Sequence, residues 1–136
     1  MKVTVIADAV IEKEGKVLLL KRASDKKFLP SYWDLPGGKV EEKEDPNTAI
    51  KREVLEETNL QVKSAKPRYV WSYQLQNRPG EFFIVINYLV KCHDYDKIQV
   101  RKEEHSEFKW LTIDEIEKLN YFSPEMKIAV NKVLEK

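Results

Sequence analysis

Apolar and polar positions alternate at the amino-terminal end of the chain in a way that predicts β-structure. Val3–Ile11 is rich in β-branched residues and roughly alternates, and Lys16–Arg22 is a short apolar run of strand length. The intervening Lys13-Glu14-Gly15 has turn composition, so the two runs are predicted to form a hairpin. The polar, lysine-bearing stretch Ala23–Ser31 is predicted to be a loop.

The next periodic segment predicts a helix over Pro46–Thr58. Asp45 is a favoured N-cap and is followed by proline, which suits the first helical position. Asn59 tolerates the left-handed conformation in which helices often end. Ile50 and Val54 fall on one stripe that can pack against a sheet.

The second half of the chain predicts another hairpin. Positions from Tyr69 to Leu75 alternate, Phe82–Val90 is a near-continuous β run, and Asn77–Gly80 between them has turn chemistry. A strand that is apolar throughout is typical of the centre of a sheet, so Phe82–Val90 is predicted to be central.

The carboxyl-terminal part predicts one strand and two helices. Phe108–Leu111 has the length of a short strand, and Thr112–Glu115 is a capping box that opens a short helix. Ser123 precedes a proline and caps a last helix, with an apolar face formed by Met126, Ala129, Val130 and Val133. This order of elements predicts an α/β (α+β) fold in which helices pack on a sheet without regular βαβ repetition.

Composition narrows the possible functions. The chain has 136 residues, of which 42% are apolar and 35% charged, and its net charge is +1. We therefore expect one domain over residues 1–136, with no general attraction to nucleic acid or membrane. The single cysteine, Cys92, and the lack of a spanning segment or signal peptide favour the cytoplasm. The oligomeric state, monomer or homodimer, stays open.

The predicted helix carries an unusual concentration of carboxylates. Glu53, Glu56 and Glu57 stand at i, i+3 and i+4 and share one helix face. Arg52 can pair with Glu56, but one arginine cannot neutralise three acids. Oxygen ligands of this kind suit Mg²⁺ or Mn²⁺, whereas the alternative is a solvated helix face.

The wider segment Gly38–Leu60, GKVEEKEDPNTAIKREVLEETNL, resembles the Nudix box, the signature of the Nudix hydrolase family. The preceding WDLPGG and the later Trp110-Leu111 fit the same family, in its short MutT-like branch. The resemblance implies an α/β/α sandwich around a mixed β-sheet and hydrolysis of a nucleoside diphosphate linked to another moiety. The chain departs from the family at Asn59, where a glycine is usual, and we expect little loss of chemistry there.

The resemblance also implies residue roles. Glu53, Glu56 and Glu57 would bind Mg²⁺ or Mn²⁺, with a carbonyl of Gly37 or Gly38 as a further ligand. Arg52 and Glu44 would maintain the catalytic geometry. Lys39 and Gly38 would bind phosphate, and Arg22 would bind the nucleotide. A late-loop glutamate, Glu103 or Glu104, would add a metal ligand or base, and Glu104 is preferred for its distance from Trp110. Which glutamate is the general base stays open.

Aromatic residues and histidines complete the candidates. A nucleobase could stack on one of several aromatic side chains, although packing in the core or a hairpin is the more frequent role of such residues. These are Trp33, Trp71, Tyr73 and Tyr121. His93 and His105 lack partners at ligand spacing and are expected to be bystanders.

Three functions remain for this pattern. The first is hydrolysis of a (deoxy)nucleoside triphosphate, standard or oxidised. The second is hydrolysis of ADP-ribose or another nucleotide sugar, for which the family's downstream proline is missing near Gln76. The third is a binding or regulatory module without catalysis, which is disfavoured because all three box carboxylates are present.

Overall fold

A mixed seven-stranded sheet forms the centre of the molecule, and the computed structural model describes residues 1–135. The main path of the sheet is β3-β2-β1-β6-β5, with β4 paired to β1 and β7 paired to β2. The strands are β1 (Lys2–Lys13), β2 (Lys16–Arg22), β3 (Trp33–Asp34), β4 (Gly37–Lys39), β5 (Val62–Tyr73), β6 (Glu81–Cys92) and β7 (His105–Thr112). The predicted domain includes Lys136, which lies outside the described residues.

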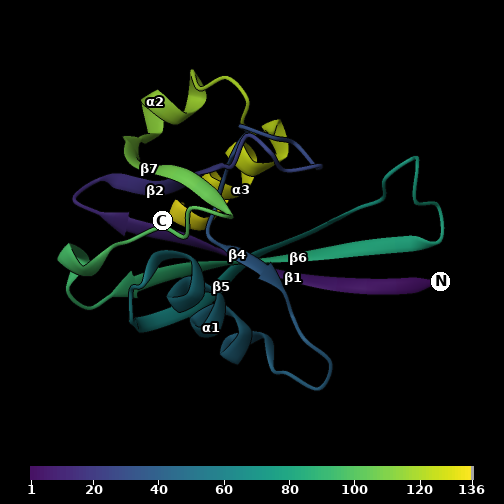
Figure 1. Ribbon diagram of the computed structural model, residues 1–136. Coiled ribbons are helices and arrows are strands. Elements are labelled where there is room, and N and C mark those ends of the chain that lie inside the picture. The colour runs from purple at the N-terminus through teal and green to yellow at the C-terminus, as the bar shows by residue number, and fades with distance from the viewer. Residues whose placement is uncertain (136) are drawn as a thin grey trace.

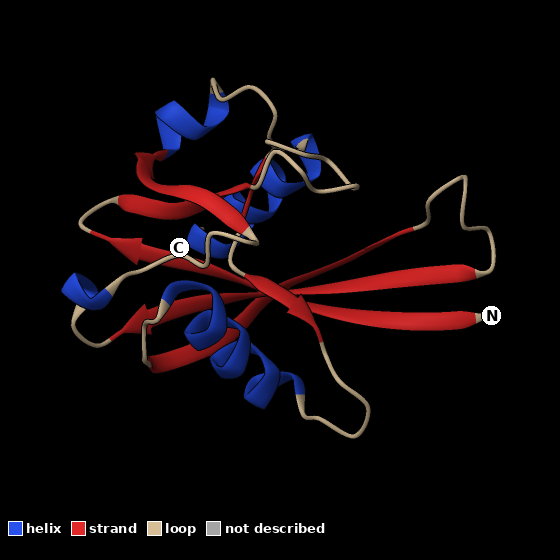
Figure 2. Ribbon diagram, in the orientation of Figure 1, coloured by secondary structure: helices blue, strands red, loops and turns tan. Residues whose placement is uncertain are grey.

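Both predicted hairpins are confirmed. Strands β1 and β2 are antiparallel and join through a turn at Gly15, and β5 and β6 are antiparallel along nearly their full length. Strand β6 lies between β1 and β5, so its predicted central position is correct. It runs parallel to β1, from the pair Lys2↔Glu81 to the pair Ile11↔Val90 (Figure 2).

The prediction for β5 was wrong at both ends. The strand begins at Val62, well before Tyr69, and it ends at Tyr73, so Leu75 lies outside it. Its first half carries Lys63, Lys66 and Arg68, which gave it a polar composition. An edge strand tolerates such residues because one of its sides faces solvent.

Helices cover both faces of the sheet, which gives the expected α/β/α arrangement (Figure 1). The helices are α1 (Pro46–Thr58), α2 (Ile113–Glu117) and α3 (Pro124–Leu134), together with the 3-10 turn η1 (Tyr95–Lys97). Helix α1 has the predicted bounds, with its N-cap at Asp45 and a left-handed Asn59 (φ 64°) at its end. The predicted capping box of α2 is also present.

Two hydrophobic clusters correspond to the two faces. Beneath α1, Ile50 and Val54 are fully buried against Ala7 and Ala9 of β1. Beneath α3, Val130 and other apolar residues pack against Val10 and Leu89. Within residues 1–135, no helix combines the length and apolar character required to cross a lipid bilayer.

Candidate active site

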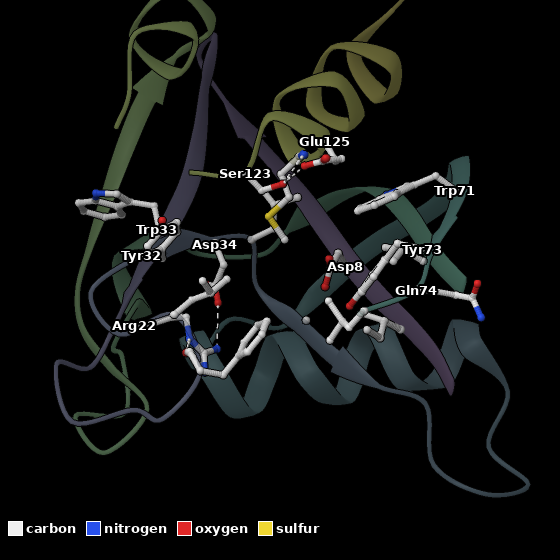
Figure 3. Close-up of a pocket in the computed structure, with 18 residues that line it drawn as sticks. Asp8, Arg22, Tyr32, Trp33, Asp34, Trp71, Tyr73, Gln74, Ser123 and Glu125 are labelled. Carbon is white, nitrogen blue, oxygen red and sulfur yellow. Dashed lines mark hydrogen bonds and ion pairs between the residues drawn. The ribbon is translucent and has the colours of Figure 1, made fainter. Parts of the chain in front are cut away.

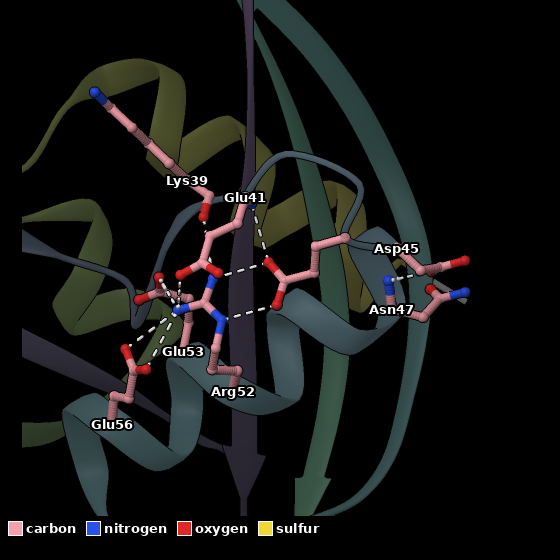
Figure 4. A network of polar contacts seen from close by, with 8 residues as sticks. Lys39, Glu41, Asp45, Asn47, Arg52, Glu53 and Glu56 are labelled. Atoms are coloured by element: carbon pink, nitrogen blue, oxygen red, sulfur yellow. Dashed lines mark hydrogen bonds and ion pairs between the residues drawn. The ribbon is translucent and has the colours of Figure 1, made fainter.

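Arg52 lies at the centre of a network of carboxylates on the exposed side of α1 (Figure 4). Its Nε and Nη2 donate to the two oxygens of Glu44, at 2.8 and 2.9 Å. Its Nη1 donates to Glu53 at 2.9 Å and to Glu56 at 3.2 Å, and Nη2 also donates to the carbonyl of Lys39 at 3.2 Å. The loop before α1 and the acidic face of α1 are therefore held together by one guanidinium.

This bidentate contact stabilises the ionised form of Glu44. The hydrogen bonds from Arg52, and then the bond from the backbone of Glu41, lower the pKa of Glu44 from 4.5 to about 2. The pKa of Arg52 is raised in turn, chiefly by its hydrogen bond to Glu44. The pair is therefore ionised throughout the neutral range.

Glu57 faces the glycine loop, and no cationic side chain of residues 1–135 forms an ion pair with it. Its Oε1 accepts a hydrogen bond of 2.8 Å from the N–H of Gly37. Burial, which outweighs that bond, together with repulsion from Asp34, Glu53 and Asp8 raises the pKa of Glu57 to about 9. Burial likewise raises the pKa of Glu53, against the opposing effect of Arg52.

The two glycines allow β1 and α1 to approach each other. A Cβ atom at Gly38 would lie 2.7 Å from the carboxyl carbon of Glu53. A Cβ atom at Gly37 (φ 155°) would overlap the carbonyl of Ala7 and the carboxylate of Asp8. A side chain at Gly37 would meet backbone atoms of β1, and one at Gly38 would displace the Glu53 carboxylate, which is the close approach that the sequence indicated.

Asp8 is an acidic residue of this site that the sequence analysis missed. It lies in β1, is only 6% exposed, and pairs with Gly37 of β4. Burial, followed by the charges of Asp34 and Glu53, raises its pKa well above the usual range. A lone carboxylate in the apolar run VIADAVI was the available signal, because a buried acid usually has a function or a partner.

The donor set fits a hard divalent cation. Within residues 1–135, the His, Cys, Asp and Glu side chains as placed form no group of three or more that could hold a metal ion. Glu53 and Glu56 are directed at Arg52 and Glu57 at Gly37. However, burial and, after it, repulsion between neighbouring acids raise the pKa values of Glu53, Glu57 and Asp8. Carboxylate oxygens in that condition suit Mg²⁺ or Mn²⁺.

A cavity of about 460 Å³ opens beside this carboxylate cluster (Figure 3). Its floor is the face of the sheet opposite α1, where Ile6, Val85, Trp71 and Tyr73 lie in adjacent strands. The loop after β2 and the start of α3 also line the cavity. Gly37 lines the cavity while its N–H bonds Glu57, so the cavity and the carboxylate cluster meet at this residue.

Arg22, Asp34 and His105 form a second polar group at the cavity. Arg22 contacts Asp34 at 3.5 Å and donates to the carbonyl of Phe28 at 2.9 Å. His105 Nε2 lies 3.2 Å from Asp34 Oδ1, and the histidine is only 3% exposed. The sequence analysis expected His105 to be a bystander and missed this partner, because Asp34 comes from β3, far away in the sequence. His93 is exposed.

The remaining candidates lie apart from the glutamates of α1. Glu104 pairs with Lys26 at 2.6 Å, and Glu103 pairs with Arg101 at 3.1 Å. Across the described residues, no hydrogen bond or ion pair joins Glu104 to Glu53, Glu56 or Glu57. The side chain of Lys39 is exposed.

Comparison with known proteins agrees with this geometry. The family model of the NUDIX domain matches residues 2–132, which is nearly the whole chain. The chain belongs to the Nudix family. Its fold class and its MutT-like character, both predicted with the help of the element order, are confirmed by the relatives described next.

Two relatives illustrate the range of Nudix activities. The 8-oxo-dGTP diphosphatase of Buchnera aphidicola is 29% identical over 128 residues, which cover 94% of this chain and 92% of that protein. The CTP pyrophosphohydrolase of Escherichia coli is 40% identical over 76 residues, covering 54% of this chain and 53% of that protein.

Among solved structures, a MutT NUDIX hydrolase from Burkholderia pseudomallei superposes with a TM-score of 0.83. It is 25% identical, and the match covers 98% of this chain and 99% of that one. A MutT protein from Methanosarcina mazei gives a TM-score of 0.84 at 23% identity, which supports the fold. This Nudix chain is accordingly a hydrolase that acts on phosphoric anhydrides, and members of its family generally use divalent metal ions.

Proposed function

We propose that this Nudix hydrolase converts a (deoxy)nucleoside triphosphate, with a standard or an oxidised base, to the monophosphate and pyrophosphate with the help of Mg²⁺ or Mn²⁺. The observation that carries this proposal is the position of Gly37. One side of this residue faces the cavity, which can take a nucleoside, and the other bonds Glu57, which can hold a metal near the phosphates. The similarity to an 8-oxo-dGTP diphosphatase also supports it.

In this proposal, the glutamates of α1 hold the metal. Glu53, Glu56 and Glu57 supply carboxylate oxygens, and Gly37 supplies a carbonyl. A bound divalent cation would neutralise phosphate charge and acidify a water molecule. Glu56 is the most adaptable of the three because its contact with Arg52 is long and its side chain is 45% exposed.

Other residues of the chain position the substrate and the metal ligands. Arg52 and Glu44 keep the Glu53 side chain oriented, because each fixes the other through two hydrogen bonds. Lys39 and the Gly38 backbone bind phosphate, and Arg22 binds the nucleotide at the cavity. Glu104 serves as a late-loop metal ligand or base if its side chain leaves Lys26 and contacts the metal.

The reaction adds water across one phosphoanhydride bond. The water oxygen bonds to phosphorus in line with the bond that breaks, and the water loses a proton to a carboxylate of the cluster. The leaving phosphate oxygen takes up the electrons of the broken bond.

One panel experiment tests the substrate. The protein is incubated with Mg²⁺ and standard dNTPs, 8-oxo-dGTP, ADP-ribose or diadenosine polyphosphates, and the products are separated by ion exchange. We expect monophosphate and pyrophosphate from a triphosphate substrate. Preferential cleavage of ADP-ribose would replace this proposal with the nucleotide-sugar alternative, and no hydrolysis at any pH would favour a binding module.

A matched pair of variants tests the site. Glu57→Gln should lower kcat by roughly a thousandfold, because it removes a metal ligand without removing volume. Glu42→Gln makes the same chemical change at an exposed position and should leave kcat unchanged. Near-normal activity in Glu57→Gln and in Glu56→Gln would refute the metal assignment.

A further inference from the structure

An unpaired buried amide lies directly behind the cavity. Asn87, in the central strand β6, is only 1% exposed. Its Oδ1 accepts a hydrogen bond of 2.9 Å from Nε1 of Trp71, but its Nδ2 has no hydrogen-bond partner among residues 1–135. Burying an amide with one end unsatisfied costs free energy. Val85 and Leu89 flank Asn87 on the same face of β6, and Asp8 is its partner in the register with β1.

The register of the sheet shows what Asn87 can act on. Ile6, Val85 and Trp71 form one row across β1, β6 and β5, and all three line the cavity. Asn87 belongs to the next row, toward α3, beside Asp8 of β1. Asn87 itself does not line the cavity, but the Trp71 indole that donates to it does.

Trp71 ends a series of three aromatic rings, of which Trp71 and Tyr73 line the cavity. Tyr73 stacks on Phe83 with centroids 4.8 Å apart and a 6° interplanar angle, and Trp71 follows at 5.4 Å and 31°. Figure 3 shows Trp71 and Tyr73 on the same side of the cavity. An indole at the end of such a series can rotate about its own side-chain bonds, and the hydrogen bond to Asn87 selects one orientation.

From this arrangement we infer that Trp71 is the stacking surface for the nucleobase and that Asn87 is a positioning residue that fixes its orientation. The inference rests on the proposed function and deepens it. The affinity of the site for a nucleotide then depends on a flat aromatic base as well as on the phosphates. Base–aromatic stacking is tolerant of sequence, so this surface favours any nucleoside triphosphate over a base-free polyphosphate.

A double-mutant cycle tests this pair. The variants are Asn87→Leu, Trp71→Phe and the double variant, with Trp110→Phe as a matched control on the other face of the sheet. Steady-state hydrolysis of the best dNTP gives KM and kcat. Calorimetric titration with the α,β-imido dNTPs and with inorganic tripolyphosphate gives binding with and without a base.

We expect Asn87→Leu to raise KM and the Kd of the imido dNTP by about fivefold, with kcat and the thermal midpoint preserved. In the Trp71→Phe background, which lacks the indole N–H, Asn87→Leu should cause no further change. Trp71→Ala should weaken nucleotide binding by about ten- to a hundredfold, whereas tripolyphosphate binding stays constant. Trp110→Phe should alter none of these quantities.

Two results would overturn the inference. One is equal weakening by Asn87→Leu in the wild-type and Trp71→Phe backgrounds, since Asn87 would then act independently of the indole. The other is normal nucleotide binding by Trp71→Ala. Either result leaves the proposed function intact as long as dNTPs are hydrolysed, whereas failure of every dNTP to bind or react overturns both.

Discussion

A methyl group added at Gly38 would meet the carboxylate of Glu53, whereas one added at Gly37 would overlap the backbone of β1. The first neighbour is the end of a flexible side chain and can move, but the second cannot. At the scale of single residues, adjacent glycines in this Nudix domain therefore have separable roles. Gly38 leaves room for the Glu53 carboxylate, and Gly37 leaves room for the backbone of β1.

This difference predicts opposite phenotypes for two alanine variants. Gly38→Ala should keep the thermal midpoint within about 2 °C and lower kcat by roughly tenfold or more, because Glu53 is displaced. Gly37→Ala should cost about 2–4 kcal/mol of unfolding free energy. Urea denaturation and steady-state kinetics on both variants provide the measurement. Equal loss of stability in both would contradict it.

The pair Glu44–Arg52 predicts a pH-dependent contribution to stability. The pKa of Glu44 is lowered from 4.5 to about 2 in the folded state, so the unfolded state binds more protons between these values. The stabilisation is therefore complete above about pH 4.5 and is lost as the pH falls toward 2. The difference in unfolding free energy between wild type and Glu44→Gln should be constant at pH 6–8 and shrink in acid.

Glu42→Gln serves as the control for this titration. Glu42 is exposed in the same loop, so this variant removes a surface charge without removing a contact to Arg52. If the difference in unfolding free energy between wild type and Glu44→Gln increased on acidification, its sign would contradict a lowered pKa of Glu44.

At the scale of elements, helix α1 shows how much of the site the local sequence determines. Its N-cap, its bounds and its last residue were predicted from Asp45, the following proline and Asn59, because caps are local interactions. The acidic face followed from the helical period. The contacts of Arg52 with Glu44 and Glu53 bring together residues close in sequence, so they too were within reach of sequence reasoning.

The parts that were missed depend on contacts between distant strands. Asp8 and Asn87 are brought together by the pairing of β1 with β6, and Asp34 and His105 by the pairing of β3 and β7 with β2. Nothing in the local sequence determines that register. The start of β5 was missed for another reason, because an edge strand can be polar and still pair along β6.

The end of α1 gives a prediction at this scale. Asn59 has φ 64° and its side chain donates to the carbonyl of Lys97 at 3.0 Å. Asn59→Ala should cost about 1–2 kcal/mol, because a Cβ-bearing residue without a local hydrogen bond is strained in the left-handed region. Asn59→Gly, which restores the usual family residue, should lie within about 0.5 kcal/mol of wild type, since the relief of strain offsets the lost side-chain bond. Thermal or urea denaturation measures both variants. Equal losses of unfolding free energy in Asn59→Ala and Asn59→Gly would contradict the explanation by backbone strain.

At the scale of the whole molecule, the reactivity of Cys92 provides a measure of global unfolding. The thiol is buried beneath α1 at the end of β6, and burial raises its pKa to about 11. Labelling by a disulfide reagent at pH 8 should therefore be slow in the native protein and fast in 6 M urea. Its rate in dilute denaturant should follow the unfolding equilibrium, and the Cys92→Ser protein gives the background. Rapid labelling that is insensitive to denaturant would show that the thiol is accessible in the native state.

The parallel pairing of β1 with β6 affects how the chain acquires this structure during synthesis. Strand β1 is synthesised well before its main partner β6, which begins at Glu81. Until β6 emerges, β1 can pair with β2 and β4 and pack against α1, but it lacks its longest partner. Nascent chains that end before Glu81 should therefore remain open to proteases and chaperones, and longer ones should become resistant once β6 is available. The glutamate-bearing helix is complete long before the cavity beside it can form.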